Sequence, residues 1–241
     1  MLGVGMFGQD MAICSSRKVP VAVYPLRVRS GAAINYCYIL QDEVTKRAVI
    51  VDPAWDSAAI ELALANLGAE LGAVVLTHSH DDHVNAAPQL AMRHKCPVYM
   101  SAGEIAVSHF RCPGLRPVWD GHEIVVDSVS LTVLLTPGHT SGSVCYLQEH
   151  ALFSGDTLFI EGCGIIADPC GDVDDMYRSI QKLHRMVPGD IRVWPGHRYR
   201  SELGLSMAEV VEKNIYFSLQ DINQFRRFRM RAGQVGLFNF K

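Results

Sequence analysis

Three histidines and two aspartates stand within six residues, directly after the apolar run AVVLT at 73–77. Because alternate residues of an extended segment point to the same side, His78 and His80 would face one centre together. Asp82 and His83, where the chain turns into a helix, would address a neighbouring centre. Imidazoles and carboxylates at this density suit Zn²⁺ or another divalent first-row metal. The alternative, a polar helix start capped by Asp82, explains only one of these residues.

Three further candidates follow strand-like runs later in the chain, and each comes directly after a glycine. They are His139 in the run TPGHT, Asp156 in SGDT and His197 in PGH. Glycine lets the backbone approach a crowded centre closely. Each residue alone would be interpreted as part of a turn, but the repeated pattern indicates that all three belong with the histidine run.

The ordered set H-x-H-x-D-H, P-G-H-T, S-G-D-T and P-G-H resembles the metallo-β-lactamase superfamily from residue 24 to about residue 217. The resemblance implies an αββα sandwich with two metal ions at one edge of its sheets. By the same resemblance, His78, His80 and His139 would hold the first ion. Asp82, His83 and His197 would hold the second, and Asp156 would bridge the two. The implied cofactor is two Zn²⁺, although iron or manganese would fit the same ligands.

Such a site predicts hydrolysis by a hydroxide that bridges the metals, with Asp82 as the catalytic residue that orients it. The chain has no G-x-S-x-G elbow that would support a serine nucleophile. We find no spare histidine or glutamate near the motifs to protonate a leaving group. A thiolate departs without such an acid, whereas an amine or alkoxide generally needs one. An acyl thioester is therefore the expected substrate.

The stretch GDTLFIEGCG (155–164) is similar to glyoxalase II, the hydroxyacylglutathione hydrolases. Directly afterwards the sequence departs from that family, because residues 161–175 hold five acidic side chains and no basic ones. With its GCGI variant and its NIYF…GLFNFK ending, the chain most resembles the zinc-dependent hydrolases found with trans-acyltransferase polyketide synthases. That resemblance implies a role in polyketide biosynthesis, on a carrier-protein-bound or small acyl thioester. Glyoxalase II proper, an iron-dependent persulfide dioxygenase and a metal-stabilised scaffold without turnover remain as alternatives.

The last twenty residues carry five basic side chains and no acidic ones, interleaved with phenylalanines. Arg226, Arg227 and Arg229 are the candidates for substrate binding, because arginine pairs with phosphate bidentately. The competing interpretation is a solvated basic helix whose phenylalanines pack onto the sandwich.

The elements that must position these residues follow from hydrophobic periodicity. Strand-like runs cluster and then alternate with helices in both halves of the chain, which predicts an α/β fold of two sheets with helices outside them, a four-layer αββα sandwich. Helices are expected over 57–67, 84–94, 101–109, 173–187 and 207–231. We interpret residues 1–20 as a flexible leader, with Met11 as a second candidate start, and 21–241 as one hydrolase domain with a basic C-terminal helix and tail.

The composition limits which binding partners and which cellular compartment the chain could have. The chain has 25 acidic and 22 basic side chains. The resulting net charge of −3 argues against nucleic acid as a binding partner. No apolar run reaches the about 18 residues that a transmembrane helix needs, and the start lacks the features of a secretory signal. Seven scattered cysteines without a C-x-x-C pair favour reduced thiols and the cytoplasm. The acyl group, the thiol carrier and the oligomeric state stay open.

Overall fold

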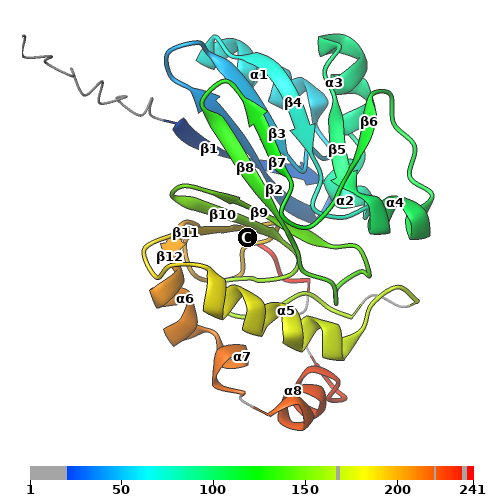
Figure 1. The fold of residues 1–241 in the computed structure, drawn as a ribbon, viewed down its shortest axis with the longest axis vertical. Helices are drawn as coiled ribbons and strands as arrows, with labels where there is room; N and C mark the ends of the chain where they lie inside the picture. The colour runs from blue at the N-terminus through cyan, green and yellow to red at the C-terminus, as the bar shows by residue number, and fades with distance from the viewer. Residues whose placement is uncertain (1–20, 167–168, 220, 235–237) are drawn as a thin grey trace, which may run out of the picture.

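The computed structural model describes residues 21–166, 169–219, 221–234 and 238–241, so the predicted leader at 1–20 lies outside the described residues. Two six-stranded sheets form its centre (Figure 1). Helices cover the outer face of each sheet, and the two inner faces pack on each other. The predicted four-layer αββα arrangement is therefore confirmed.

The first sheet has the strand order β1-β2-β3-β4-β5-β6. Its first three strands pair antiparallel, and β3 to β6 run parallel because helices connect them. The strands are β1 (Val21–Ser30), β2 (Ala33–Asp42), β3 (Arg47–Val51), β4 (Glu70–Val75), β5 (Val98–Ser101) and β6 (Leu115–Val118). The connecting helices are α1 (Ser57–Leu67), α2 (Asp81–Val84), α3 (Ala87–His94) and α4 (Ala102–Ser108).

The second sheet has the order β12-β11-β10-β9-β8-β7 and is antiparallel except between β10 and β11. Its strands are β7 (Glu123–Val126), β8 (Val129–Leu135), β9 (Val144–Gln148), β10 (Ala151–Gly155), β11 (Arg192–Pro195) and β12 (Leu205–Ser206). Helix α5 (Val173–Met186) makes the parallel crossover from β10 to β11 and lies across the outer face (Figure 1). The last three helices lie on the same side of this sheet (Figure 1): α6 (Met207–Lys213), α7 (Ile215–Ser218) and α8 (Ile222–Arg229).

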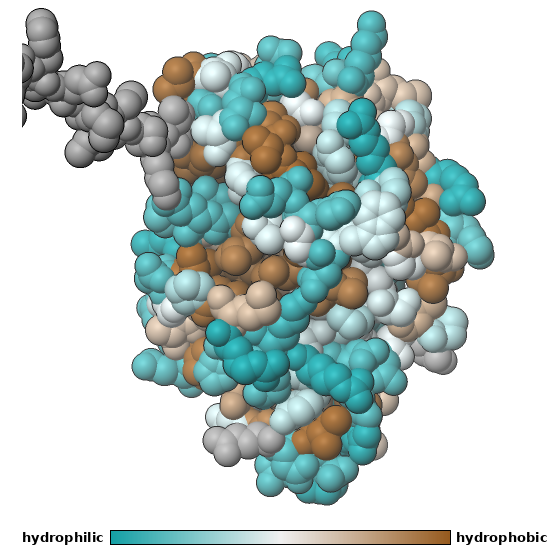
Figure 2. Space-filling view, in the orientation of Figure 1, coloured by the Kyte–Doolittle hydropathy of each residue, from teal (hydrophilic) through white to brown (hydrophobic). Residues whose placement is uncertain are grey.

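The core between the sheets is built from β-branched and aromatic residues at alternate strand positions. Tyr38 of β2 packs against Phe153 of β10 with ring centroids 5.4 Å apart, and both side chains are fully buried. The face shown in Figure 2 carries mainly polar side chains, with apolar ones gathered at the level of the sheets. The packed sheets thus form a rigid support at whose edge loops can be held in place.

Local capping explains where the helices begin and end. Asp56 caps α1 by accepting a hydrogen bond from Ala59 N, and Gly68 ends the helix in the left-handed region at φ +59°, as the sequence predicts. The helix predicted over 84–94 begins only at Ala87, because α2 is a separate single turn. The unbroken helix predicted over 207–231 is wrong: Asn214 and Asp221 accept backbone hydrogen bonds and start two new helices.

Candidate metal centre

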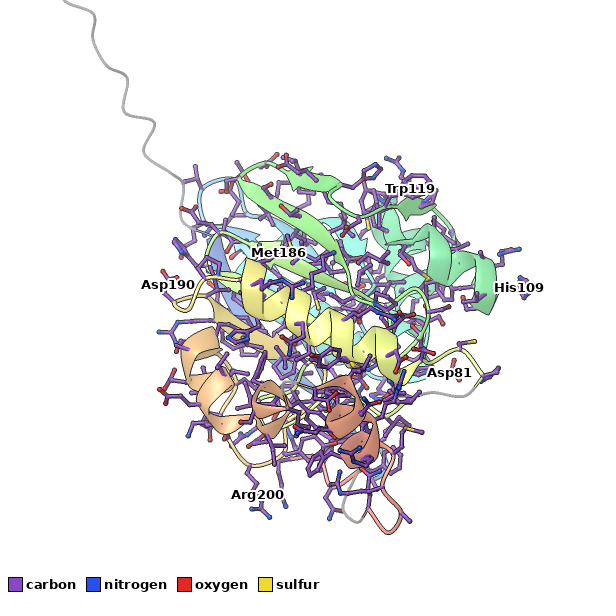
Figure 3. The ribbon with its side chains drawn as sticks, turned by 60° about the horizontal axis from the view of Figure 1, so that its bottom comes forward. Asp81, His109, Trp119, Met186, Asp190 and Arg200 are labelled. Atoms are coloured by element: carbon purple, nitrogen blue, oxygen red, sulfur yellow. The ribbon has the colours of Figure 1, made fainter. Side chains whose placement is uncertain are left out.

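All seven predicted metal ligands lie together at one edge of the sandwich, where strands of both sheets end. The loop after β4 carries His78 and His80, and α2 carries Asp82 and His83. The other three follow β8, β10 and β11 of the second sheet, at His139, Asp156 and His197. Asp81, labelled in Figure 3, is exposed beside them. Each sheet thus supplies part of the site, so the packing of the two sheets sets its geometry.

The first group consists of three histidines whose nitrogen atoms converge. His80 Nδ1 lies 3.1 Å from His78 Nε2 and 3.0 Å from His139 Nε2. Asp156 Oδ2 lies 3.6 Å from His139 Nε2. The three histidine nitrogen atoms fall within 4.8 Å of one another, a separation that fits shared coordination of one ion.

The second group lies on the other side of Asp156. Asp82 Oδ2 is 3.4 Å from His197 Nε2 and 3.8 Å from His83 Nε2. The carboxylate of Asp156 also faces this group, with Oδ1 3.4 Å from His83 Nε2 and Oδ2 3.4 Å from His197 Nε2. Asp156 is therefore the residue shared by both groups.

The donor set fits a metal. Among the described residues, Asp156 Oδ1 is buried and has no hydrogen-bond partner, which is costly for a carboxylate oxygen unless an ion occupies the space beside it. Burial alone would raise the pKa of Asp156, but the neighbouring His197 and His83 hold that pKa well below its ordinary value. Burial lowers the pKa of His78 and of His139, which keeps both imidazoles neutral. A deprotonated carboxylate and neutral imidazoles are the forms that bind metal ions.

Hydrogen bonds on the far side of each ring fix the orientation of the imidazoles. His139 Nδ1 donates to the carbonyl oxygen of Ile165 (2.6 Å) and His197 Nδ1 to that of Ile34 (3.0 Å), which directs Nε2 of both rings toward the centre. His83 Nδ1 lies 2.9 Å from Asp52 Oδ2. These contacts hold the ligands in position before any ion binds.

Glycine is required where the backbone passes closest to the ligands. A Cβ on Gly196 would stand 2.5 Å from His83 Cε1 and 2.7 Å from Asp156 Oδ1. A Cβ on Gly155 would meet the Thr77 side chain at 2.4 Å, and this residue also has a φ of +48°. The close approach inferred from the sequence therefore has a direct steric cause.

Three supporting residues were missed by the sequence analysis. Asp52 accepts hydrogen bonds from Thr77 N (2.7 Å) and Thr77 Oγ1 (2.6 Å). Asn35 Nδ2 donates to Asp82 Oδ2 (3.1 Å). Glu104, buried in α4, accepts from the loops that carry the first group. The one available signal was the run VDPAWD after β3, since a polar residue at a strand end near the motifs is a candidate for such a role.

A cavity of about 620 Å³ opens beside the second group. Phe159 lines it and packs its ring 5.9 Å from that of His197. Arg229 also lines it, and its Nε donates to the carbonyl oxygen of Gly164 (3.0 Å). The remaining lining residues are Glu161, Gly162, Cys163, Tyr199, Arg200, Tyr216, Arg231, Gln234, Asn239 and Lys241.

The three arginines predicted to bind substrate have different surroundings. Arg229 is buried in the cavity wall. Arg226 lies on the exposed side of α8 and forms an ion pair with Asp174. Arg227 is also exposed on α8. Arg200 and Arg231 line the cavity but were not proposed for it from the sequence, and Arg200 projects outward in Figure 3.

The family model described as the metallo-beta-lactamase superfamily matches residues 31–197, and this chain belongs to that superfamily. It is 42% identical over 219 residues to the probable polyketide biosynthesis zinc-dependent hydrolase PksB of Bacillus subtilis, an alignment that covers 91% of this chain and 97% of that protein.

Two further comparisons agree. A hydroxyacylglutathione hydrolase of Alkalilimnicola ehrlichii is 36% identical over 200 residues, with 83% of this chain and 75% of that protein covered. The crystal structure of ETHE1 from Myxococcus xanthus superposes with a TM-score of 0.75 at 28% identity, covering 90% of this chain and 95% of that one. The predictions of the superfamily, of its fold and of a metal-dependent hydrolase are confirmed. None of the helices in the described ranges is long and apolar enough to cross a membrane.

Proposed function

We propose that this protein is a hydrolase that binds two zinc ions and cleaves an acyl thioester in polyketide biosynthesis. The observation that carries the proposal is the pair of ligand groups joined by Asp156, whose buried Oδ1 makes no hydrogen bond among the described residues and faces His83 Nε2 at 3.4 Å. When bound, zinc ions supply Lewis acidity and lower the pKa of coordinated water. The name of the Bacillus subtilis relative supports zinc and the polyketide setting.

Asp82 is the proposed catalytic residue within this set. Its side chain is one-third exposed, whereas those of His83 and His197 are buried, so its carboxylate faces the space that a substrate would enter. Asn35 Nδ2 fixes Oδ2 of Asp82 at 3.1 Å. A held carboxylate at this place can orient a water molecule and accept its proton.

The chemical nature of the leaving group can be inferred from the other carboxylates near the site, which already accept hydrogen bonds. Asp52 and Glu104 are buried and accept several hydrogen bonds each. Glu161 of the cavity wall accepts a hydrogen bond from Ser201 N (2.6 Å). None of these three carboxylates is thus left over as an evident proton donor. That arrangement favours a thiolate, which leaves without one.

The cavity supports a thiol carrier with negative charge. Its wall holds four cationic side chains and one carboxylate, and Arg229 has no ion-pair partner among the described residues. A buried guanidinium without an anion is costly, so a phosphate or carboxylate of the substrate would stabilise it. We propose phosphopantetheine on a carrier protein as this group, with Arg229 as its contact, Arg226 and Arg227 on the approach side, and a cytoplasmic setting in keeping with the free cysteines.

The test compares one acyl group on three carriers: glutathione, coenzyme A and a phosphopantetheinylated carrier protein. We expect the highest kcat/KM for the carrier-protein thioester. Arg229→Met should raise KM for the two phosphate-bearing substrates by about 10–100-fold, the effect of losing 1.5–3 kcal/mol. Arg93→Met is the matched control: Arg93 is exposed on α3 and does not line the cavity, so its loss should change KM far less.

Other outcomes would assign the alternatives. A preference for the glutathione thioester would make the protein a hydroxyacylglutathione hydrolase proper. One iron per chain together with oxygen uptake would replace the hydrolase by a persulfide dioxygenase. Binding of the carrier protein without turnover would leave a scaffold.

A further inference from the structure

Residues 238–241, here called the strap, return from α8 to the metal centre. Lys241 N donates to the carbonyl oxygen of Arg198 (2.8 Å), next to the ligand His197. Tyr36 Oη of β2 donates to the backbone oxygen of Lys241 at 2.9 Å. The strap is thus fastened to both sheets at the edge that carries the ligands.

Phe240 of the strap stacks face to face on the imidazole of His197. The ring centroids are 3.8 Å apart and the planes differ by 13°. Tyr199 packs its edge against Phe240 at 5.2 Å, and Phe159 packs its edge against His197 at 5.9 Å. The His197 imidazole is thus covered on one face by Phe240 and contacted by Phe159.

The hydrogen bond of His197 does not by itself fix the plane of the imidazole ring. The bond from Nδ1 to the Ile34 carbonyl holds one atom of the ring but allows the plane to rock about that point. A flat ring stacked at van der Waals distance opposes the rocking and excludes water from that face. Nε2 of His197 then stays aimed at Asp82 Oδ2 and Asp156 Oδ2, each 3.4 Å away.

We propose that Phe240 is a positioning residue for the second metal ion: it holds the ring of His197 in the orientation that ligation needs. The proposal rests on the proposed metal centre. The strap should affect the second group alone. The rings of the first group make their contacts with one another and with His83, and none of these contacts involves the strap.

The test titrates metal-free protein with zinc against a chelator of known affinity, so that the two binding steps are resolved without substrate. Phe240→Ala should weaken the second step by about 10–100-fold, the range found when a group that orients a metal ligand is removed, and leave the first step within about twofold. Phe240→Tyr keeps the stacked ring and should restore the second step. Tyr36→Phe, which removes one fastening of the strap, should fall between Phe240→Ala and the wild type.

Phe238→Ala is the matched control, because Phe238 belongs to the same strap, is 69% exposed and touches Phe240 only by its edge. It should bind zinc as the wild type does. Equal loss at both steps in Phe240→Ala, or the same loss in Phe238→Ala, would overturn the proposal, as would unchanged binding. Thioester turnover is measured separately, so a wild type that binds two zinc ions without hydrolysing thioesters would contradict the proposed function and not the role of Phe240.

Discussion

At the scale of single residues, the centre depends on backbone that has no room for a side chain. Gly164 lies eight residues after Asp156, the residue shared by both candidate ligand groups, and its N–H donates to the Asp156 carbonyl oxygen at 2.9 Å. A Cβ at this position would lie 2.1 Å from that same oxygen and 2.9 Å from His139 Nδ1. Because the oxygen belongs to the backbone, it cannot move aside cheaply.

We therefore expect Gly164→Ala to displace Asp156 and to lower zinc affinity by about 10–100-fold. Gly162→Ala, two residues away, is the control: its Cβ would meet nothing nearer than Tyr216 Cε2 at 3.9 Å. Zinc titration of both variants decides the matter. Equal affinities would show that the close approach does not constrain the site.

Asp52 gives a second prediction at this scale. Its Oδ2 faces His83 Nδ1 at 2.9 Å and accepts from Thr77 Oγ1 at 2.6 Å. Asp52→Asn keeps the shape but weakens the acceptor that holds His83, and should reduce zinc affinity by about 10–100-fold. Equilibrium dialysis against zinc measures this change, and Asp127→Asn, at an exposed turn, should leave the affinity as it is.

The candidate ligands were predictable from the sequence because their signals are local. His78, His80, Asp82 and His83 are recognised by their spacing, and the three later candidates, His139, Asp156 and His197, by the glycine before each. The supporting residues carry no such signal: Asp52 is 31 residues from His83 and Asn35 is 47 from Asp82. Only the packing of β2 and β3 beside β4 brings them to the site.

At the scale of elements, α4 joins the two loops that carry the first ligand group. Glu104 accepts from Ser79 N (2.9 Å) and Ser79 Oγ on one side, and from Thr140 Oγ1 (2.7 Å) and Gly142 N (3.1 Å) on the other. The carboxylate is 1% exposed and receives all four hydrogen bonds at its two oxygens. It therefore links the β4 end of the first sheet to the β8 end of the second.

Glu104→Gln replaces one acceptor oxygen by an N–H₂ donor that faces other donors. We expect a loss of about 1–3 kcal/mol in the free energy of unfolding and weaker zinc binding at the first step. Urea denaturation of the metal-free proteins measures the first effect. Glu123→Gln, exposed on β7, is the control, and a similar loss there would mean that Glu104 has no special role.

Elements with clear periodicity were predicted well, and short or interrupted ones were not. The helix over 57–67 has both a capping residue and a glycine stop. The long helix over 207–231 seemed continuous because its apolar residues keep helical spacing. Asn214 interrupts it, because its side chain donates to the carbonyl oxygens of Phe159 and Gly162 (2.9 and 2.8 Å). These partners are 55 and 52 residues away in the sequence, so a local pattern cannot predict the interruption. The strands β6 and β12 were missed, because the run LRPV of β6 contains an arginine and a proline and β12 has only two residues.

At the scale of the whole molecule, the sheets are also joined far from the metal centre. Asp42, at the end of β2, accepts from Ser128 Oγ (2.7 Å) in the turn between β7 and β8, and from Val44 N and Thr45 N. The Ser128 hydroxyl and the Thr45 and Val44 N–H groups hold the pKa of Asp42 well below its ordinary value. The carboxylate form is thus the one that the fold stabilises.

This contact predicts a pH dependence of stability. A pKa that is lower in the folded state gives stabilisation that is fully present above the unfolded pKa of about 3.9 and is lost as the pH falls further. Asp42→Asn should lower the melting temperature at pH 7 and reduce its fall between about pH 4 and pH 2. Melting curves of both proteins over this range test it, and parallel curves would contradict it.

The charge pattern of the whole chain also has a structural explanation. The acidic stretch after the metal centre and the basic stretch of α8 meet in space, where Asp174 pairs with Arg226 and Asp172 caps α5. Four cations of the cavity wall have no ion pair with a described residue, and of these Arg229 is buried. The negative charge of the acidic stretch and the positive charge of α8 thus partly neutralise each other. The positive charge that is not neutralised lies in the cavity where a substrate would bind.

The most direct test of the central claim is thiol release from one acyl thioester, measured with wild type loaded with zinc, wild type stripped of metal, and His80→Ala. We predict turnover by the loaded protein, loss on stripping and recovery when two zinc ions per chain are restored. In His80→Ala, kcat/KM should fall by more than about 100-fold, because losing a ligand should cost more than losing a group that only supports one. Wild-type rates from the stripped protein or from His80→Ala would contradict the account.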